Sequence, residues 1–155
     1  MKRVHAVLFA VIAALATPAL AQTASDMQIL RDKIKADKKL LVAQNMQLTD
    51  AEAKAFWPIY EAYQKDLQAI NQRIGKAILA YAEAYKGDSL TDAQAKTLVD
   101  EAIAIEAAEA QLRKDYSAKL AKALPGKKVA RYLQIENKIR AVIRFDLAAQ
   151  IPLAQ

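Results

Sequence analysis

The sequence predicts an all-α protein: a long antiparallel helical hairpin with flanking N- and C-terminal helices, four helices in all. Three observations lead to this fold class. Apolar residues recur every three or four positions over long stretches, which is the period of an amphipathic helix. Alanine, the strongest helix former, supplies 34 of the 155 residues. The chain has only three Gly and four Pro, too few for a β-sandwich or a barrel.

Residues 1–21 have the features of a cleaved signal peptide. Lys2 and Arg3 precede an apolar run at positions 7–16, and an Ala-Leu-Ala sequence at 19–21 forms a small-residue cleavage site. The apolar run is shorter than the roughly 20 residues that a membrane-spanning helix needs. We therefore expect the mature chain to begin near Gln22, to reside in the periplasm and to have no stable membrane insertion; an uncleaved anchor is the alternative.

The expected mature chain lacks the residues of most catalytic and metal sites. Removal of residues 1–21 would leave 134 residues with a side-chain charge of +4, no Cys and no His, because His5 lies in the removed segment. These absences exclude thiol nucleophiles, Ser-His-Asp triads and His-ligated metals, and Met27 and Met46 alone cannot build a metal site. We expect no enzyme, no metal and no cofactor. The charge permits association with anionic partners but is not the footprint of a nucleic-acid-binding protein.

The mature chain is expected to form a single all-helical domain over residues 22–150, followed by a short tail at 151–155. Helices are predicted over about 26–44, from 50 to a stop at Gly87, from 92 to 124, and from the Pro125-Gly126 break to about 147. The short connection at 87–89 favours antiparallel packing of the two long helices.

The two long helices open with the same short motif. In each, a threonine side chain can accept a hydrogen bond from the third helical amide while the residue at that position reaches back, which makes a capping box. Leu48, Thr49 and Glu52 form the first copy, and Leu90, Thr91 and Gln94 form the second.

The only dense aromatic cluster lies near the start of the second helix. Phe56, Tyr60 and Tyr63 share its apolar seam, and Trp57 lies about 100° away around the helix. Packing in the core around Pro58 is one interpretation. The other is an amphipathic anchor patch, because aromatic rings with polar tips suit the recognition of unfolded segments. On that hypothesis these four aromatic residues bind client proteins.

Three glutamates lie close to the predicted apolar stripes of the last two helices. Glu106 and Glu109 are expected to face solvent or to pair with Arg113 on the same helix. Glu136 is expected to pair with Arg140 four residues later or to make a contact to another helix that sets the register.

The repeated Leu-Thr-x-x-Gln/Glu opening, in a small exported helical chain without Cys, resembles the LTxxQ-motif family of periplasmic helical proteins, which includes Spy and CpxP. Leu90, Thr91 and Gln94 match the motif, and in the first copy Glu52 stands where the motif has Gln. The resemblance implies a helical hairpin that dimerises into a curved cradle. It also implies a protein that holds non-native envelope proteins without ATP or dampens a stress-sensing kinase.

We therefore expect an ATP-independent periplasmic chaperone or envelope-stress modulator. It would bind unfolded or partly folded envelope proteins through an apolar and basic helical surface. A heptad-like seam serves packing within one chain and between two chains equally, so both a monomer and a homodimer stay open. The alternative function is that of a non-catalytic regulatory or structural protein that docks to one envelope partner.

Overall fold

The structure is a computed structural model that describes residues 29, 32, 34, 37–87 and 89–154. It divides into two units, residues 1–38 and residues 39–155. The described residues of the first unit are helical. The predicted signal peptide, its cleavage site and the start of the first predicted helix lie outside the described residues. No helix in the described part of the chain has the length and apolar character needed to cross a membrane.

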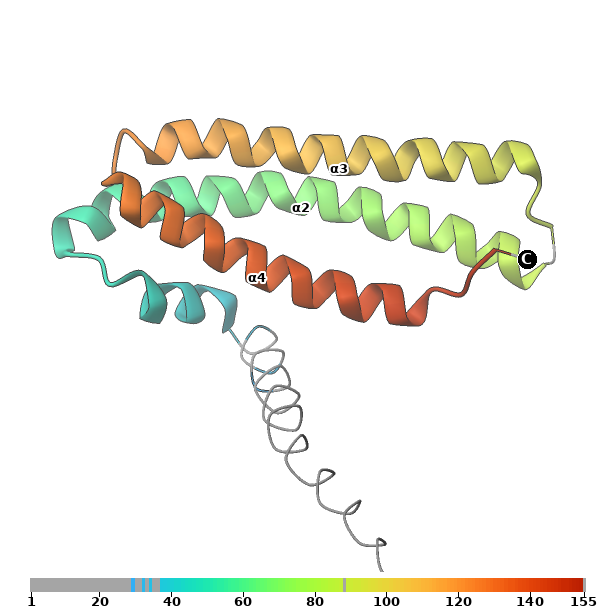
Figure 1. Ribbon diagram of the computed structural model, residues 1–155, viewed down its shortest axis with the longest axis horizontal. Helices are drawn as coiled ribbons and strands as arrows, with labels where there is room; N and C mark the ends of the chain where they lie inside the picture. The colour runs from blue at the N-terminus through green and yellow to red at the C-terminus, as the bar shows by residue number, and fades with distance from the viewer. Residues whose placement is uncertain (1–28, 30–31, 33, 35–36, 88, 155) are drawn as a thin grey trace, which may run out of the picture. The chain divides into compact units, whose positions relative to one another are not determined.

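All regular secondary structure in the described residues of the second unit is helical (Figure 1). The end of a first helix runs to residue 46, and it is followed by α2 (Asp50–Lys86), α3 (Asp92–Leu120) and α4 (Gly126–Gln150). α2 and α3 form a long antiparallel hairpin, and α4 turns back and runs along it. The predicted fold class, an all-α hairpin with flanking helices, is confirmed.

The third helix ends earlier than predicted, at Leu120 rather than at Leu124. The amides of Ala123 and Leu124 both donate to the Leu120 carbonyl, at 2.9 Å each, so the chain closes into a tight turn there. Leu124, the last residue of this turn, is buried. An apolar residue at the end of a periodic pattern can therefore belong to the loop that covers the core as well as to the helix.

Both long helices begin with the predicted capping boxes. The Thr49 hydroxyl accepts from the Glu52 amide at 3.3 Å, while the Glu52 carboxylate accepts from the Thr49 amide at 2.8 Å. Thr91 and Gln94 repeat the arrangement at 3.3 Å and 2.9 Å. Each box satisfies amides that the first turn of a helix leaves without a partner.

The core of the second unit is concentrated where α3 turns into α4, which we call the α3–α4 end. Most of the largest fully buried side chains lie there: Val42, Met46, Phe56, Leu120 and Tyr132. At the opposite end, where α2 turns into α3, α2 buries only Ala84 beyond Ile70. The two ends of one helical body therefore differ in how much apolar surface they remove from water.

Candidate functional site

The aromatic cluster of α2 closes around one ring from α4. The ring of Tyr132 lies 5.1 Å from Phe56, 6.2 Å from Tyr60 and 6.0 Å from Tyr63, centroid to centroid, in edge-on arrangements. Such geometries are favourable for aromatic pairs. The rings thus join α4 to α2.

Three of the four residues predicted to bind clients are inaccessible in this fold. The exposed fractions of Phe56, Tyr60 and Tyr63 are 0%, 3% and 4%. The fold places these three side chains in the core, as the first interpretation expects, because Tyr132 covers the seam on which they lie. Trp57 remains half-buried, with its ring 5.3 Å below the Lys39 ammonium. The 100° offset around the helix was the signal that separated Trp57 from the others.

Polar side chains form hydrogen bonds within this aromatic core. The Gln64 amide donates to the Glu136 carboxylate at 3.1 Å and to the Tyr132 hydroxyl at 3.4 Å, so Glu136 makes the interhelical contact that was one of its two expected roles. Burial raises the pKa of Tyr63 to about 12, and the negative charge of Glu136 adds to this effect. The Tyr63 phenol therefore stays protonated at physiological pH.

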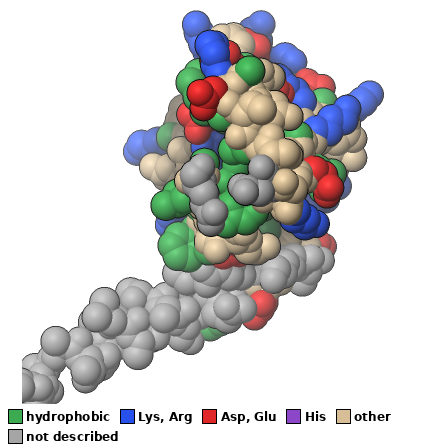
Figure 2. All heavy atoms as spheres, turned by 90° about the vertical axis from the view of Figure 1, so that its right-hand side faces the viewer, with side chains coloured by type: hydrophobic (Ala, Val, Ile, Leu, Met, Phe, Trp, Pro, Cys, Tyr) green, Lys and Arg blue, Asp and Glu red, His purple; other side chains and the backbone are tan. Residues whose placement is uncertain are grey.

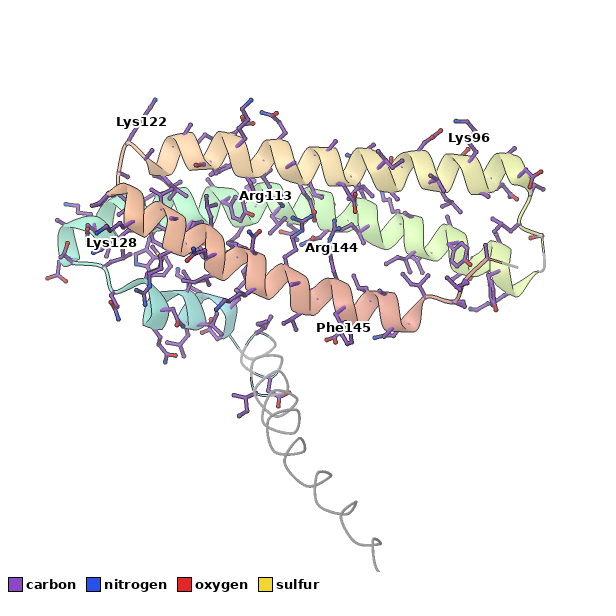
Figure 3. The ribbon with its side chains drawn as sticks, viewed as in Figure 1. Lys96, Arg113, Lys122, Lys128, Arg144 and Phe145 are labelled. Atoms are coloured by element: carbon purple, nitrogen blue, oxygen red, sulfur yellow. The ribbon has the colours of Figure 1, made fainter. Side chains whose placement is uncertain are left out.

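A second polar cluster joins α3 to α4. Glu109, which is 4% exposed, pairs with both Arg140 and Arg144, the latter at 2.7 Å, and Arg144 also pairs with Glu106 at 2.9 Å. Figure 3 shows Arg144 pointing from α4 toward α3. The predicted solvated position is right for Glu106, whose side chain is 62% exposed, and wrong for Glu109. The predicted pairing with Arg113 is wrong for both, because α4 supplies their cations. Burial lowers the pKa of Arg140, and its Nε is buried without a hydrogen-bond partner among the described residues.

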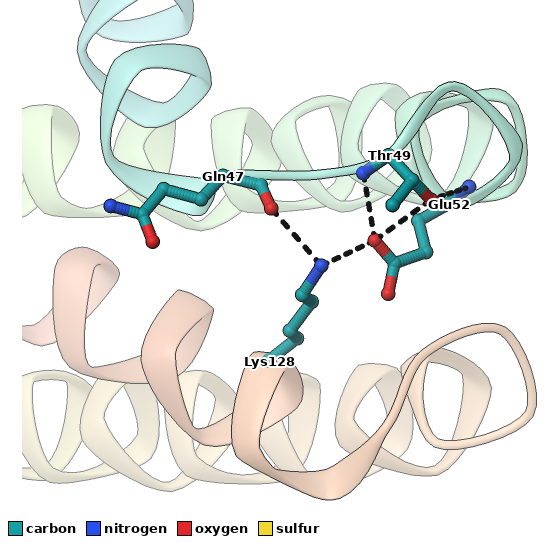
Figure 4. Close-up of polar contacts among 4 residues, drawn as sticks. All are labelled: Gln47, Thr49, Glu52 and Lys128. Atoms are coloured by element: carbon teal, nitrogen blue, oxygen red, sulfur yellow. Dashed lines mark hydrogen bonds and ion pairs between the residues drawn. The ribbon is translucent and has the colours of Figure 1, made fainter.

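Glu52, which stands where the second capping box has Gln94, also pairs with a cation. Lys128, from the first turn of α4, reaches the Glu52 carboxylate and also donates to the Gln47 carbonyl at 3.0 Å (Figure 4). Gln47 has a left-handed backbone with φ of 50°, which turns the chain between the first helix and α2. A carboxylate at position 52 can cap α2 and pair with a cation at the same time, whereas the glutamine amide of Gln94 only caps α3.

Replacing Glu52 by Gln is expected to lower the melting temperature at pH 7 while leaving the capping box intact. The hydrogen bond from Lys128, followed by that from the Thr49 amide, lowers the pKa of Glu52 below its ordinary value of 4.5. A carboxylate whose pKa is lower in the folded than in the unfolded state stabilises the folded protein at pH values above the unfolded pKa. This stabilisation is lost as the pH falls through the folded pKa. Thermal unfolding followed by circular dichroism should therefore show a gap between the wild type and E52Q at pH 7 that closes below pH 4.5.

The reverse substitution at the second motif, Gln94→Glu, is the matched control. It exchanges the same two groups in the same capping position, but no cation pairs with this position among the described residues. If the effect of E52Q came from capping alone, Q94E would give a change of similar size and opposite sign. A larger change in E52Q identifies the contact with Lys128 as its source.

Large apolar side chains are exposed at the end opposite the main core. They come from α2, α3, α4 and the chain that follows α4, and Figure 2 looks onto this end and shows hydrophobic side chains gathered between charged ones. We call this set the apolar end; it comprises Leu79, Val99, Ile103, Phe145, Ile151 and Leu153. The Tyr81 hydroxyl donates to the Pro152 carbonyl at 2.9 Å and ties the last residues to α2.

The sequence analysis did not identify the residues of the apolar end as candidates for binding. Leu98 and Ile105 mark the seam that faces the core, and Val99 and Ile103 form a second stripe one helical turn apart on another face. The exposed fractions are 56% for Val99 and 61% for Ile103, so both side chains of the stripe are open to solvent. The sequence held one signal for them: α3 has apolar residues on two faces. Because only one face can form the buried seam, the second apolar stripe indicates exposed apolar side chains.

The exposed groups of the candidate site are suited to hydrophobic binding. In the described part of the chain, no group of three or more His, Cys, Asp and Glu side chains could hold a metal ion. The buried carboxylates Glu109 and Glu136 are engaged by side chains of other helices. The exposed groups at the apolar end are hydrocarbon side chains, which contribute to binding through the area that a partner removes from water.

Comparisons with known proteins give no relative for this chain. No family model matches it, and neither a curated protein nor a solved structure matches it. The likeness to the LTxxQ-motif family therefore rests on the two capping motifs and their context.

Proposed function

We propose that the protein is an ATP-independent chaperone of the periplasm that holds non-native segments of envelope proteins at its apolar end. The observation that carries this proposal is the exposure of large apolar side chains from three helices, with 65% of Leu79, 61% of Ile103 and 64% of Phe145 accessible. Several separated apolar positions on a rigid helical surface suit weak, multipoint contact with varied chains. A site built for one substrate would instead present a concave pocket with a few convergent polar groups.

The charged residues around these positions fit the same role. Lys96 and Asp100 lie on α3 beside Val99, and they pair with each other at 2.6 Å on the exposed surface. Arg73 of α2 forms a two-pronged contact to Glu101 of α3 at 2.9 Å and 3.0 Å, which holds the hairpin together at this end. Client contact therefore needs no unfolding of the hairpin. This role agrees with what the LTxxQ resemblance implies, but it moves the binding residues from the aromatic cluster to the apolar end.

The triple variant V99Q/I103Q/F145Q is expected to weaken client capture by at least about ten-fold, because each side chain buried by a client contributes on the order of 1.5 kcal/mol or more. Glutamine is a good helix former, so the helices should persist. The measurement is light scattering from a chemically denatured client diluted into buffer without ATP, with and without the protein. Circular dichroism checks that the variant is folded.

The double variant A107Q/A110Q is the matched control. It adds the same side chains to exposed positions of α3 without removing a large apolar group. It should suppress scattering as the wild type does. Equal suppression by the triple variant would contradict the apolar end as the binding surface. No suppression by the wild type at several-fold excess would overturn the chaperone proposal and favour docking to one dedicated envelope partner.

A further inference from the structure

The positive charge of the chain is concentrated at the α3–α4 end. Residues 113–131 contain seven Lys and Arg and one Asp, a net charge of +6, which equals the formal net charge of the whole chain. The remaining residues thus sum to zero. The segment covers the last two turns of α3, the turn that follows and the start of α4, so the charge lies opposite the apolar end (Figure 1).

Five of these cations are exposed and carry no carboxylate partner within the described chain. We call the four nearest the turn between α3 and α4, without Lys114, the basic end. Lys122 projects from the turn and away from the helices (Figure 3), and Lys127 lies in the first turn of α4. The set comprises Lys119, Lys122, Lys127 and Arg131. Lys119 lies 3.9 Å over the Tyr116 ring, and the Arg131 guanidinium donates to the Asn45 carbonyl. Their charge is therefore not neutralised internally.

The start of α4 adds to the positive potential instead of reducing it. Its first turn has no acidic residue, and Pro125 at the cap provides no side-chain hydrogen bond. A helix N-terminus carries a partial positive charge that acidic residues normally offset. Of the two lysines in this turn, Lys128 pairs with Glu52, whereas Lys127 has no carboxylate partner in the described chain and lies unfavourably close to the helix N-terminus. An anionic partner would relieve that unfavourable arrangement.

We propose that the basic end docks the protein on an anionic phospholipid surface, a role that goes beyond client capture. Within residues 113–131, all of which the structure describes, no large hydrophobic side chain is exposed. An interface with a folded protein normally needs such anchors at its centre. Lysines, which predominate here, act as mobile point charges, whereas recognition of a particular carboxylate favours arginine. The combination fits a spread-out layer of phosphate headgroups.

Docking in this way would orient the molecule. α3 has 29 residues and a rise of about 1.5 Å per residue, so the start of α3 would stand about 40 Å from the lipid headgroups. The apolar end would then face away from the lipid. Lipid docking and client capture use different side chains, and the two proposals can fail independently.

The test is sedimentation with vesicles, using the chain from Gln22 onward. Vesicles of phosphatidylcholine alone are compared with vesicles that contain equal parts of phosphatidylglycerol. Binding is expected only to the anionic vesicles at about 50 mM salt, and it should be lost at about 500 mM salt, where charges are screened over a few ångströms. Absence of binding at low salt, binding to neutral vesicles, or binding that survives high salt would each overturn the proposal.

The variant K122Q/K127Q is expected to lower the partition coefficient about 25-fold, or about five-fold for each cation. The control K76Q/K138Q removes the same charge from exposed lysines of α2 and α4, and it should lower binding much less. Equal losses in the two variants would overturn the basic end as the docking site.

Two further results would exclude a lipid surface as the partner. One is binding to polyglutamate that depends on Lys122 and is tighter than binding to vesicles, and the other is full competition by millimolar inorganic phosphate. Suppression of client scattering by K122Q/K127Q should equal that of the wild type.

Discussion

Replacing Tyr132 by alanine is expected to lower the free energy of unfolding by about 4 kcal/mol, the range measured for large aromatic residues in protein cores. Tyr132 is fully buried and lies within 6.2 Å of three α2 rings. Its removal leaves a cavity between two long helices that are held apart by aromatic side chains. The cavity cannot close without a shift of α4 along much of its length.

Urea unfolding provides the measurement. Trp57 is the only tryptophan, and its ring lies 5.0 Å from Phe56, so its fluorescence reports on this part of the core while circular dichroism reports on the helices. The conservative variant Y132F keeps the ring and loses the contact with Gln64, which should cost about 1 kcal/mol. F145A removes an exposed ring of similar size and should change stability by less than about 1 kcal/mol. Similar losses in Y132A and F145A would mean that the aromatic cluster is not a core.

This result would also separate the two interpretations of the aromatic cluster by experiment. If Phe56, Tyr60 and Tyr63 pack in the core, Y132A destabilises the fold. If these rings served clients directly, removing their cover would expose them and strengthen client capture without a large loss of stability. Stability and scattering measured on the same variant thus distinguish the alternatives.

Local sequence signals were sufficient to predict the helices and the residues at which they begin. Thr49 and Thr91, each followed three residues later by Glu or Gln, determine where α2 and α3 begin through contacts that span four residues. Gly87 and the Pro125-Gly126 pair mark breaks for equally local reasons. The structure agrees with the sequence on these points because no distant residue is needed to form them.

Contacts between distant residues could not be predicted in the same way. The partners of Glu109 lie 31 and 35 positions further along the chain, and a single sequence does not reveal the rotation of α4 that brings Arg140 and Arg144 to it. The choice between core packing and an anchor patch for the aromatic cluster could not be made from the sequence for the same reason. Its periodicity showed that Phe56 and Tyr60 share a face, but only the position of α4 decides that Tyr132 covers that face.

Replacing Glu109 by leucine is expected to lower the free energy of unfolding by about 3 kcal/mol, the lower part of the range for breaking a buried ion pair. Leucine leaves Arg140 without its carboxylate, and a guanidinium whose side chain is only 27% exposed is poorly hydrated. The loss stays in the lower part of the range because Arg144 keeps its contact with Glu106 at 2.9 Å. Urea unfolding followed by circular dichroism measures the difference.

The double variant E109L/R140M tests whether the loss comes from the stranded cation. Replacing both members of a buried pair by apolar residues of similar size is often neutral. Most of the stability should therefore return, and the double-mutant cycle should show a coupling of at least about 1 kcal/mol. Additive losses would mean that Glu109 acts through packing alone. A neutral E109L would mean that the pair contributes nothing to the fold.

The location of the pair also predicts which part of the molecule responds. Arg140 and Arg144 lie in the second half of α4, and their ion pairs with Glu109 and Glu106 join that half to α3. Loss of Glu109 should then release the second half of α4 while the α2–α3 hairpin, with its Arg73–Glu101 contact, stays closed. Amide hydrogen exchange should accelerate over residues 140–150 of α4 and change little over residues 70–86 of α2. Acceleration of both regions together would instead show that the three helices open as one cooperative unit.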